Sequence, residues 1–204
     1  MTRLLLLLIH SISARRIRVP RCMIVGTFLF CLLAGGGASA QHRRDPFTPP
    51  EIDQIRETSW EPQLRLSLYV KFARARLLEM DQLRSDPKVK DRAQKTHDRL
   101  DDFLLIYDEL NDNIDTYVDR KDDIRKPLKI IIDADTEFEA KLRALKDAAG
   151  IPPEESKQYE FVLTDALDTL DSSSVDHRKL MADQEDAAKH RKKSSSAQPG
   201  GRSE

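Results

Sequence analysis

A histidine and an aspartate one helical turn apart are the first residues in this sequence whose types and spacing suggest chemistry. His97 and Asp101 are four positions apart, and Asp98 directly follows the histidine. Side chains four apart share a helix face, and imidazole and carboxylate groups both bind transition metals. The spacing predicts a metal site at His97 and Asp101, completed by Asp98 or by another helix. Surface histidines in a charged protein are the competing interpretation, because structural metal sites usually show clustered ligands.

Other metal and cofactor patterns are weak or missing. His177 beside Asp176 is a similar candidate further along the chain, and two histidines on different helices can meet in a bundle. The Asn-Asp-Asn triplet at 111–113 lacks the glycine and the distal glutamate of a calcium-binding loop. Neither Glu-x-x-His nor Cys-x-x-Cys-His occurs, so the sequence indicates neither a di-iron centre nor a haem. We expect no cofactor.

A series of aspartates at helical spacing is the second candidate site. Five of them follow one another at intervals of seven, four, three and four residues, which places them on one side of a helix. These five, which we call the acidic stripe, are Asp101, Asp108, Asp112, Asp115 and Asp119, with Asp98 and Asp122 beside them. One interpretation is a docking face for a basic protein partner, or a loose calcium site. The other is a solvated face balanced by lysines and arginines of neighbouring helices, which we favour because isolated surface charge pairs contribute little.

Catalytic signatures are absent from the sequence. It contains no Gly-x-Ser-x-Gly, no phosphate-binding loop and no His-Glu-x-x-His. Paired carboxylates are abundant, but a chain with 35 acidic residues among 204 contains such pairs by composition alone. We therefore expect a protein that binds or scaffolds and does not catalyse.

The first forty residues have the organisation of a secretory signal. Arginines between positions 15 and 21 precede a short apolar run from Ile24 to Ala34, and no acidic residue occurs in this part. The run is shorter than the ~20 residues that a membrane-spanning helix needs. Ala38 and Ala40 place small side chains three and one positions before Gln41, as signal peptidase requires. The pattern predicts cleavage before Gln41, with an uncleaved anchor as the alternative.

The start of the chain is open between Met1 and Met23. A start at Met23 leaves no positive charge before the apolar run, which favours Met1. Removal of residues 1–40 takes away both cysteines and five arginines, so the formal net charge moves from −1 to −6. We expect the remaining chain in the periplasm or outside the cell, without a disulfide or a thiol nucleophile. Its acidic charge argues against nucleic acid as a partner.

A scarcity of turn residues after the leader predicts long helices. Only three glycines follow residue 40, fewer than a sheet protein of this length would use in its turns. Thr48 and Glu51 have the spacing of a capping box, with prolines between them, and predict a short helix at about 49–58. Ser59 is predicted to cap the helix that follows.

The segment 64–72 is ambiguous, because its apolar residues alternate as in a half-buried strand. After residue 72 the alternation stops, and the apolar sequence continues without a helix breaker. Drawn as a helix, the segment has one narrow polar stripe, and nearly all other positions are apolar. We predict a helix, the most buried of the set, with a strand as the alternative.

Apolar residues at seven-residue spacing predict the next helix, from about residue 86 to 121. Its seam comprises Ala93, Leu100, Phe103, Tyr107, Leu110, Ile114 and Tyr117. The sequence leaves open whether a new helix capped by Asp123 follows or one helix continues and kinks at Pro127. Gly150 ends that segment, and prolines start the last helix shortly afterwards. From Ala182 the charged and then Ser-, Pro- and Gly-rich sequence predicts a disordered tail.

Together these patterns predict an all-α fold, an antiparallel bundle of about four main helices plus a short N-terminal helix and a disordered C-terminal tail. We divide the chain into a cleaved signal peptide at 1–40, a bundle domain at 41–181 and a tail at 182–204. The expected function is binding or scaffolding in the cell envelope, by a mature chain that does not span the membrane. The alternatives are an envelope stress protein that binds unfolded clients or senses metals, and a metal-binding module centred on His97.

Overall fold

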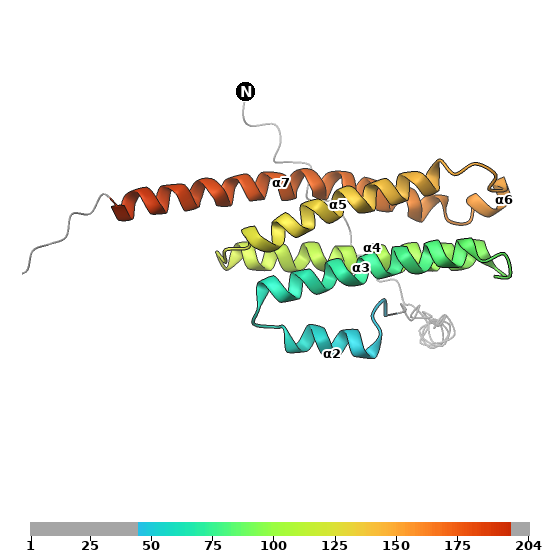
Figure 1. The fold of residues 1–204 in the computed structure, drawn as a ribbon, viewed down its shortest axis with the longest axis horizontal. Coiled ribbons are helices and arrows are strands. Elements are labelled where there is room, and N and C mark those ends of the chain that lie inside the picture. Colours follow the sequence, from blue (N-terminus) through green and yellow to red (C-terminus); the bar gives the residue numbers. More distant parts are fainter. Residues whose placement is uncertain (1–44, 197–204) are drawn as a thin grey trace, which may run out of the picture. The chain divides into compact units, whose positions relative to one another are not determined.

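Six helices form the regular structure of residues 45–196, which are the residues that the structure describes (Figure 1). The structure is a computed structural model, and it contains no strand within this range. The helices are α2 (Pro49–Glu57), α3 (Pro62–Ser85), α4 (Arg92–Asp119), α5 (Arg125–Lys146), α6 (Pro153–Ser156) and α7 (Glu160–Ser196). The predicted all-α fold is confirmed. The predicted signal peptide, with its cleavage site at Ala38, Ala40 and Gln41, lies outside the described residues.

The four long helices pack as a bundle in which each has two principal neighbours. α3 packs along α4 and α5, and α7 packs along the same two helices. Although α4 and α5 are consecutive in the chain, they therefore lie across the bundle from each other. Each long helix runs opposite to the one before it, and α2 covers the outside of α3 (Figure 1). Within residues 45–196, none of the helices combines the length and the apolar character needed to cross a membrane.

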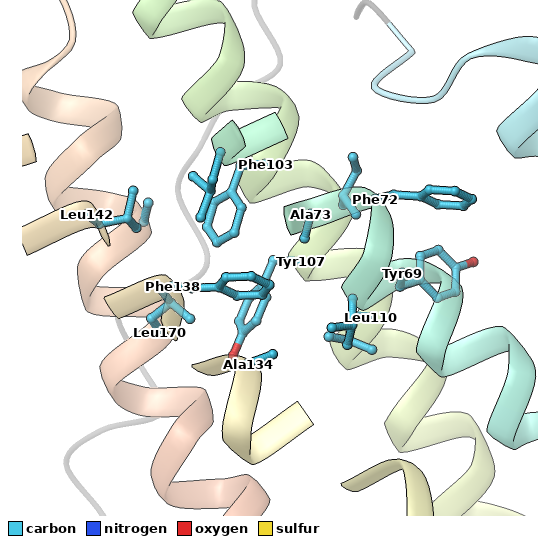
Figure 2. Close-up of a cluster of buried hydrophobic side chains, with 14 of the residues drawn as sticks. Tyr69, Phe72, Ala73, Phe103, Tyr107, Leu110, Ala134, Phe138, Leu142 and Leu170 are labelled. Atoms are coloured by element: carbon cyan, nitrogen blue, oxygen red, sulfur yellow. The ribbon is translucent and has the colours of Figure 1, made fainter. Parts of the chain in front are cut away.

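Aromatic rings from α4 and α5 fill the centre of the bundle (Figure 2). Phe103 and Tyr107 stack with their ring centroids 5.8 Å apart, and Phe138 of α5 meets the Phe103 ring edge-on at 5.4 Å. Such pairs add about 0.5–1.5 kcal/mol beyond the burial of apolar area. Every residue of the predicted seven-residue seam is buried, so the periodicity identified the core face of α4.

The ambiguous segment 64–72 is helical and belongs to α3. On the side facing the bundle, buried residues recur at helical spacing: Leu66, Val70, Ala73, Leu77 and Met80. Tyr69, Phe72 and Arg76 are also buried, on the side where Phe47 and α2 lie. A helix covered on two sides needs apolar residues at more positions than one face supplies. This double cover accounts for the buried Leu66, Val70 and Phe72 of the alternating pattern, whereas Leu64 at its start is half-exposed.

The predicted capping box starts α2 at Pro49. The Glu51 carboxylate accepts a hydrogen bond from the Thr48 backbone N–H at 2.7 Å. The same carboxylate binds the buried Arg76 guanidinium of α3 at 2.5 Å, and that guanidinium also donates to the Pro46 carbonyl at 2.8 Å. Glu51 therefore both caps the start of α2 and joins α2 to α3 through its ion pair with Arg76.

Ser59 does not cap α3, and this prediction is wrong. The residue before the first turn of α3 is Glu61, and no side chain caps that helix end. The Ser59 hydroxyl instead donates to the Arg56 carbonyl at 2.6 Å, at the end of α2. A serine between two helices can hydrogen-bond either to the end of the first or to the start of the second, and here it bonds to the end of α2.

α4 and α5 are separate helices, and the chain is not one helix kinked at Pro127. After Asp119 the chain turns at Lys121, whose φ of 62° is left-handed. The Asp122 N–H then donates to the Tyr117 carbonyl at 2.9 Å. This is a common way to end a helix, with a lysine at the position where glycine is usual.

The cap of α5 also differs from the predicted one. The capping position is Ile124, and not Asp123. The Asp123 carboxylate accepts from the Arg125 N–H at 3.3 Å and from the Arg125 guanidinium at 2.8 Å. Hydrogen bonding by this guanidinium holds the pKa of Asp123 at about 2. Asp123 therefore accepts hydrogen bonds from the first turn of α5, although it lies one residue before the capping position.

α7 continues as a helix to Ser196, although the sequence predicted disorder from Ala182. The segment is rich in Ala, Lys, Arg and acidic residues and has no Gly or Pro before Pro199, so its intrinsic propensities favour a continuing helix. Gln184 ties α7 to the α4–α5 turn, because its side-chain amide bonds the Asp122 carbonyl and the Ile124 N–H at 3.1 Å each. The remainder of the predicted tail, 197–204, lies outside the described residues.

Candidate functional site

The acidic stripe lies on the side of α4 that faces away from the core. Asp108, Asp112, Asp115 and Asp119 are exposed, and Asp101 is half-buried. Within residues 45–196, no ion pair or side-chain hydrogen bond joins Asp101, Asp112, Asp115 or Asp119 to another side chain. The basic residues that were expected to balance the stripe from neighbouring helices are not paired with these four carboxylates.

Ion pairs between helices lie on other faces of the bundle. Between α3 and α5, Arg74 binds Glu137 at 2.9 Å and Lys141 binds Asp81 at 2.7 Å. A further pair joins α5 to α7. The acids beside the stripe are also engaged, since Asp98 accepts from the side-chain amide of Gln94 and Asp122 pairs with the neighbouring arginine. Other exposed carboxylates, such as Asp133 and Asp168, also have no side-chain ion pair within residues 45–196. What distinguishes the stripe is therefore the regular spacing of its carboxylates along one helix.

His97 is 40 % exposed, and its Nδ1 lies 3.9 Å from the Asp98 carboxylate, too far for a hydrogen bond. Asp101 follows one turn later on the same helix. In the described part of the chain, no three His, Cys, Asp or Glu side chains are grouped closely enough to hold a metal ion. The metal site at His97 and Asp101 stays a prediction, and no third ligand completes it within residues 45–196.

His177, expected to resemble His97, has a different environment. His177 is 4 % exposed, whereas its neighbour Asp176 is exposed. The His177 Nδ1 lies 2.9 Å from the Asp135 carboxylate of α5, and Nε2 lies 3.2 Å from the Asn111 side-chain oxygen of α4. The sequence singled out the histidine, and it drew attention to Asn111 only as part of the triplet at 111–113. It indicated neither Asn111 nor Asp135 as a partner of His177, because both lie on other helices.

A buried polar network extends from His177 across three helices. The Tyr107 hydroxyl donates to the second oxygen of Asp135 at 2.7 Å, and the Asn111 amide donates to Ser173 of α7 at 3.0 Å. Burial, together with the Asp135 charge, raises the pKa of the Tyr107 hydroxyl far above its usual range. The phenol therefore stays protonated and remains a hydrogen-bond donor. We call these five residues the polar network.

The polar network is built to hold helices together. The ring nitrogen of His177 that points away from Asp135 is bonded to Asn111, and Ser173 is bonded to that asparagine. The histidine and the serine are thus not paired as base and nucleophile, the arrangement that acyl transfer requires. With Asp135 bound by Tyr107 and His177, each carboxylate oxygen has one partner, as a buried charge needs.

A cavity of about 280 Å³ lies between α4 and α7, beside the polar network. Its walls include the apolar Ile114, Val118 and Leu180, and its polar lining includes His177. The exposed Asp115 and Asp176 contribute one carboxylate from each helix. The stripe is therefore continuous with a groove that has apolar walls and an acidic edge.

The fold and this surface define a class, an all-α helical bundle whose α4 carries a row of aspartates on its outer side. Comparisons with known proteins do not assign the chain to a narrower class. No family model matches the chain, and neither a curated protein nor a solved structure gives a match.

Proposed function

We propose that this protein is an exported, non-catalytic helical bundle that binds or scaffolds a partner through the outer face of α4. The observation that supports this function is the set of unpaired stripe carboxylates at Asp101, Asp112, Asp115 and Asp119. Like charges one turn apart on a helix destabilise it by a few tenths of a kcal/mol per pair. A partner that carries lysines or arginines would remove this cost on binding.

The chemistry of the surface favours a basic protein segment over a metal ion. Carboxylates repeated along a helix lie about 5–6 Å apart between Cβ atoms, which suits successive basic side chains of an extended or helical segment. Chelation of calcium instead needs six to eight oxygens converging on one point. A concentrated negative field also accelerates the encounter with a basic partner and makes the association sensitive to salt.

Titration with a decalysine peptide tests the binding face. We expect the exported chain from Gln41 to bind the peptide in 50 mM salt and about tenfold or more weakly in 300 mM salt. The variant Asp112→Asn/Asp115→Asn/Asp119→Asn should lose most of this affinity. The control Asp133→Asn/Asp147→Asn/Asp168→Asn changes the net charge equally at exposed positions outside the stripe, and should bind as the wild type does. Equal affinities of the two triple variants would refute the assignment to α4.

Export is proposed from the sequence of residues 1–40. Intact-mass measurement of the protein recovered from the host's envelope fraction tests it. A chain that begins at Gln41 supports cleavage and export, and a partner that remains attached in native mass spectrometry would identify the bound molecule. A chain that retains residues 24–34 would instead be an anchored protein.

Binding of unfolded clients is the second candidate, supported by exposed aromatic side chains. Trp60 and Phe161 are 87 % and 85 % exposed, and the half-exposed Leu64 follows Trp60 one turn later. Exposed apolar side chains offer weak sites for unfolded chains. The purified protein should then suppress aggregation of an unfolded client at a near-stoichiometric ratio, and Trp60→Ser/Phe161→Ser should not. Aggregation that proceeds unchanged at a tenfold excess of the protein would exclude this candidate.

A further inference from the structure

The polar network buries an acid and a base side by side, and the directions of its hydrogen bonds limit which protons they carry. Asp135 is 2 % exposed and His177 is 4 % exposed. The Asn111 amide nitrogen donates to Ser173 at 3.0 Å, so the Asn111 oxygen is the atom that lies 3.2 Å from His177 Nε2. An amide oxygen accepts hydrogen bonds and cannot donate them. The Nε2 atom of His177 must therefore carry a proton.

The other ring nitrogen of His177 also faces an acceptor. Nδ1 lies 2.9 Å from one carboxylate oxygen of Asp135, and the second oxygen accepts from the Tyr107 hydroxyl. A hydrogen bond between Nδ1 and the carboxylate requires a further proton between them. The imidazole ring holds that proton in preference to the carboxylate, because the ordinary pKa of histidine, about 6.5, is above that of aspartate, about 3.9. Both ring nitrogens then carry a proton.

The remaining bonds of the polar network are consistent with this arrangement. Ser173, which accepts from Asn111, hydrogen-bonds the Tyr107 oxygen, and Tyr107 donates to Asp135. If the Asn111 amide were turned over, its nitrogen would donate to Nε2 and its oxygen would need the Ser173 hydrogen. The Tyr107 oxygen would then lose that donor. The observed direction gives every bond in the network one donor and one acceptor.

The charge of Asp135 also favours a cationic histidine. Within residues 45–196, the hydrogen-bond partners of its carboxylate are Tyr107 and His177, and no lysine or arginine forms an ion pair with it. Tyr107 supplies no charge, because burial raises the pKa of its hydroxyl and keeps it protonated. A buried carboxylate without a counter-charge is strongly destabilising, so His177 is the group that can neutralise Asp135.

The groups on the cavity side of His177 carry negative charge as well. Asp115 of α4 and Asp176 of α7 line the same cavity as His177, and within the described part of the chain no lysine or arginine lines it. Arg178, the next residue in α7, directs its guanidinium to the Ser174 hydroxyl at 3.2 Å. Charges from both α4 and α7 therefore add to the effect of Asp135 on α5.

We propose that His177 is an imidazolium in the folded chain, and that its second proton stabilises the packing of α7 against α4 and α5. This inference does not depend on binding at the acidic stripe. When the proton is lost, Nε2 and the Asn111 oxygen become two acceptors that face each other, and the buried Asp135 loses its counter-charge. Loss of the proton should therefore weaken the contact of α7 with α4 beside their shared cavity.

The direction of the pH effect follows from the number of protons bound. In the pH range where the folded chain holds one proton more than the unfolded chain, raising the pH favours unfolding. That range begins near pH 6.5, where histidine in an unfolded chain loses its proton. The stabilising contribution is complete below this pH and is lost as the pH rises above it.

Nitrogen-15 NMR of the histidine side chains at pH 7.5 tests the protonation directly. A histidine with the ordinary pKa of about 6.5 is mostly neutral at this pH. In the exported chain from Gln41, His177 should show two protonated ring nitrogens, and the variant His177→Gln identifies its signals by their disappearance. In the variant Asp135→Asn, which has no charge to neutralise, one ring nitrogen of His177 should lose its proton. An unprotonated ring nitrogen in the wild type at pH 7.5 would overturn the proposal, whether or not the variants fold.

Urea denaturation at pH 6.5 and pH 8.5 tests the effect of the proton on stability. The unfolding equilibrium constant of the wild type should rise by roughly tenfold between the two pH values. The matched variant His177→Gln cannot bind the proton, so its constant should rise by less than about threefold. Circular dichroism checks that the variant keeps its helix content. If the constants of both proteins rise equally, the proton does not stabilise the packing of α7 and the proposal fails.

Discussion

Asp135 and the aspartates of the acidic stripe show two opposite uses of a carboxylate in one bundle. Asp135 is 2 % exposed, and its two oxygens are bound by Tyr107 and His177. Asp112 and Asp115 are exposed and have no side-chain partner within residues 45–196. A paired buried charge holds helices in register, and its loss costs stability. An unpaired surface charge costs little to remove, so its removal should be felt mainly in binding.

The largest expected effect comes from removing a partner of the buried Asp135 carboxylate. The variant His177→Ala leaves the Asp135 carboxylate buried with Tyr107 as its remaining partner in the network. We expect the free energy of unfolding to fall by about 3–5 kcal/mol. Urea denaturation at pH 7 measures it, with the exposed Asp176→Ala as the control, which should change stability by less than about 0.5 kcal/mol. A loss below about 1 kcal/mol for His177→Ala would contradict the inference that the polar network stabilises the packing of the helices.

A carboxylate of intermediate burial should show an intermediate effect that depends on pH. Burial raises the pKa of Glu51, but hydrogen bonds and charge from Arg76 and the Thr48 N–H outweigh this, and its pKa is lowered from the usual 4.5. Because the pKa is lower in the folded chain, the ion pair contributes stability above pH 4.5, and this contribution is lost as the pH falls through the folded-state value.

The variant Glu51→Gln should therefore lose about 1–2 kcal/mol at pH 7 and much less at pH 3. Denaturation at the two pH values measures the difference, and the exposed Glu61→Gln provides the control. An equal loss at both pH values would show that the negative charge of Glu51 adds no stability beyond that of its hydrogen bonds.

Neutralising the stripe should act in the opposite direction. Asp115 and Asp119 lie one turn apart near the C-terminal end of α4, where negative charge is unfavourable to the helix dipole. The variant Asp115→Asn/Asp119→Asn should gain about 0.5 kcal/mol of stability in 50 mM salt, and screening in 1 M salt should remove most of this gain. If the variant is instead less stable than the wild type, the stripe has a structural role that the unpaired side chains do not reveal.

The smallest expected effect concerns the metal site predicted at His97 and Asp101. With two ligands on one helix turn, Zn²⁺ should raise the midpoint of thermal unfolding by only a few degrees at millimolar concentration, in line with weak binding to the folded state. The variant His97→Ala should abolish that rise. A rise of the same size in wild type and variant would place the metal elsewhere and remove His97 from consideration.

Patterns within one helix could be predicted from the sequence. The seven-residue seam of α4, the helical nature of α3 and the start of α2 at Thr48 and Glu51 depend on residues a few positions apart. Such local spacing determines which face of a helix is apolar and how its first turn is capped. The outward direction of the acidic stripe follows from the same periodicity.

Pairings between helices could not be predicted. Asp135 and His177 are separated by 42 positions in the chain, and nothing in the sequence near either residue reveals the other. The course of α7 beyond Ala182 was missed for a different reason. Charged, low-hydrophobicity sequence is typical of disorder, yet the same Ala, Lys, Arg and Glu residues have high helix propensity and continue an existing helix at low cost.

The arrangement of the long helices has a consequence for the order of folding. The most extensive contacts are made within two hairpins, α3 with α4 and α5 with α7. Tyr107 and Asn111 belong to the first hairpin, and Asp135, Ser173 and His177 belong to the second, so part of the polar network crosses between them. Hairpins of adjacent helices form early because their contacts are local, whereas this crossing closes only when the two halves meet. A variant that breaks the polar network should therefore unfold faster than the wild type and refold at nearly the same rate.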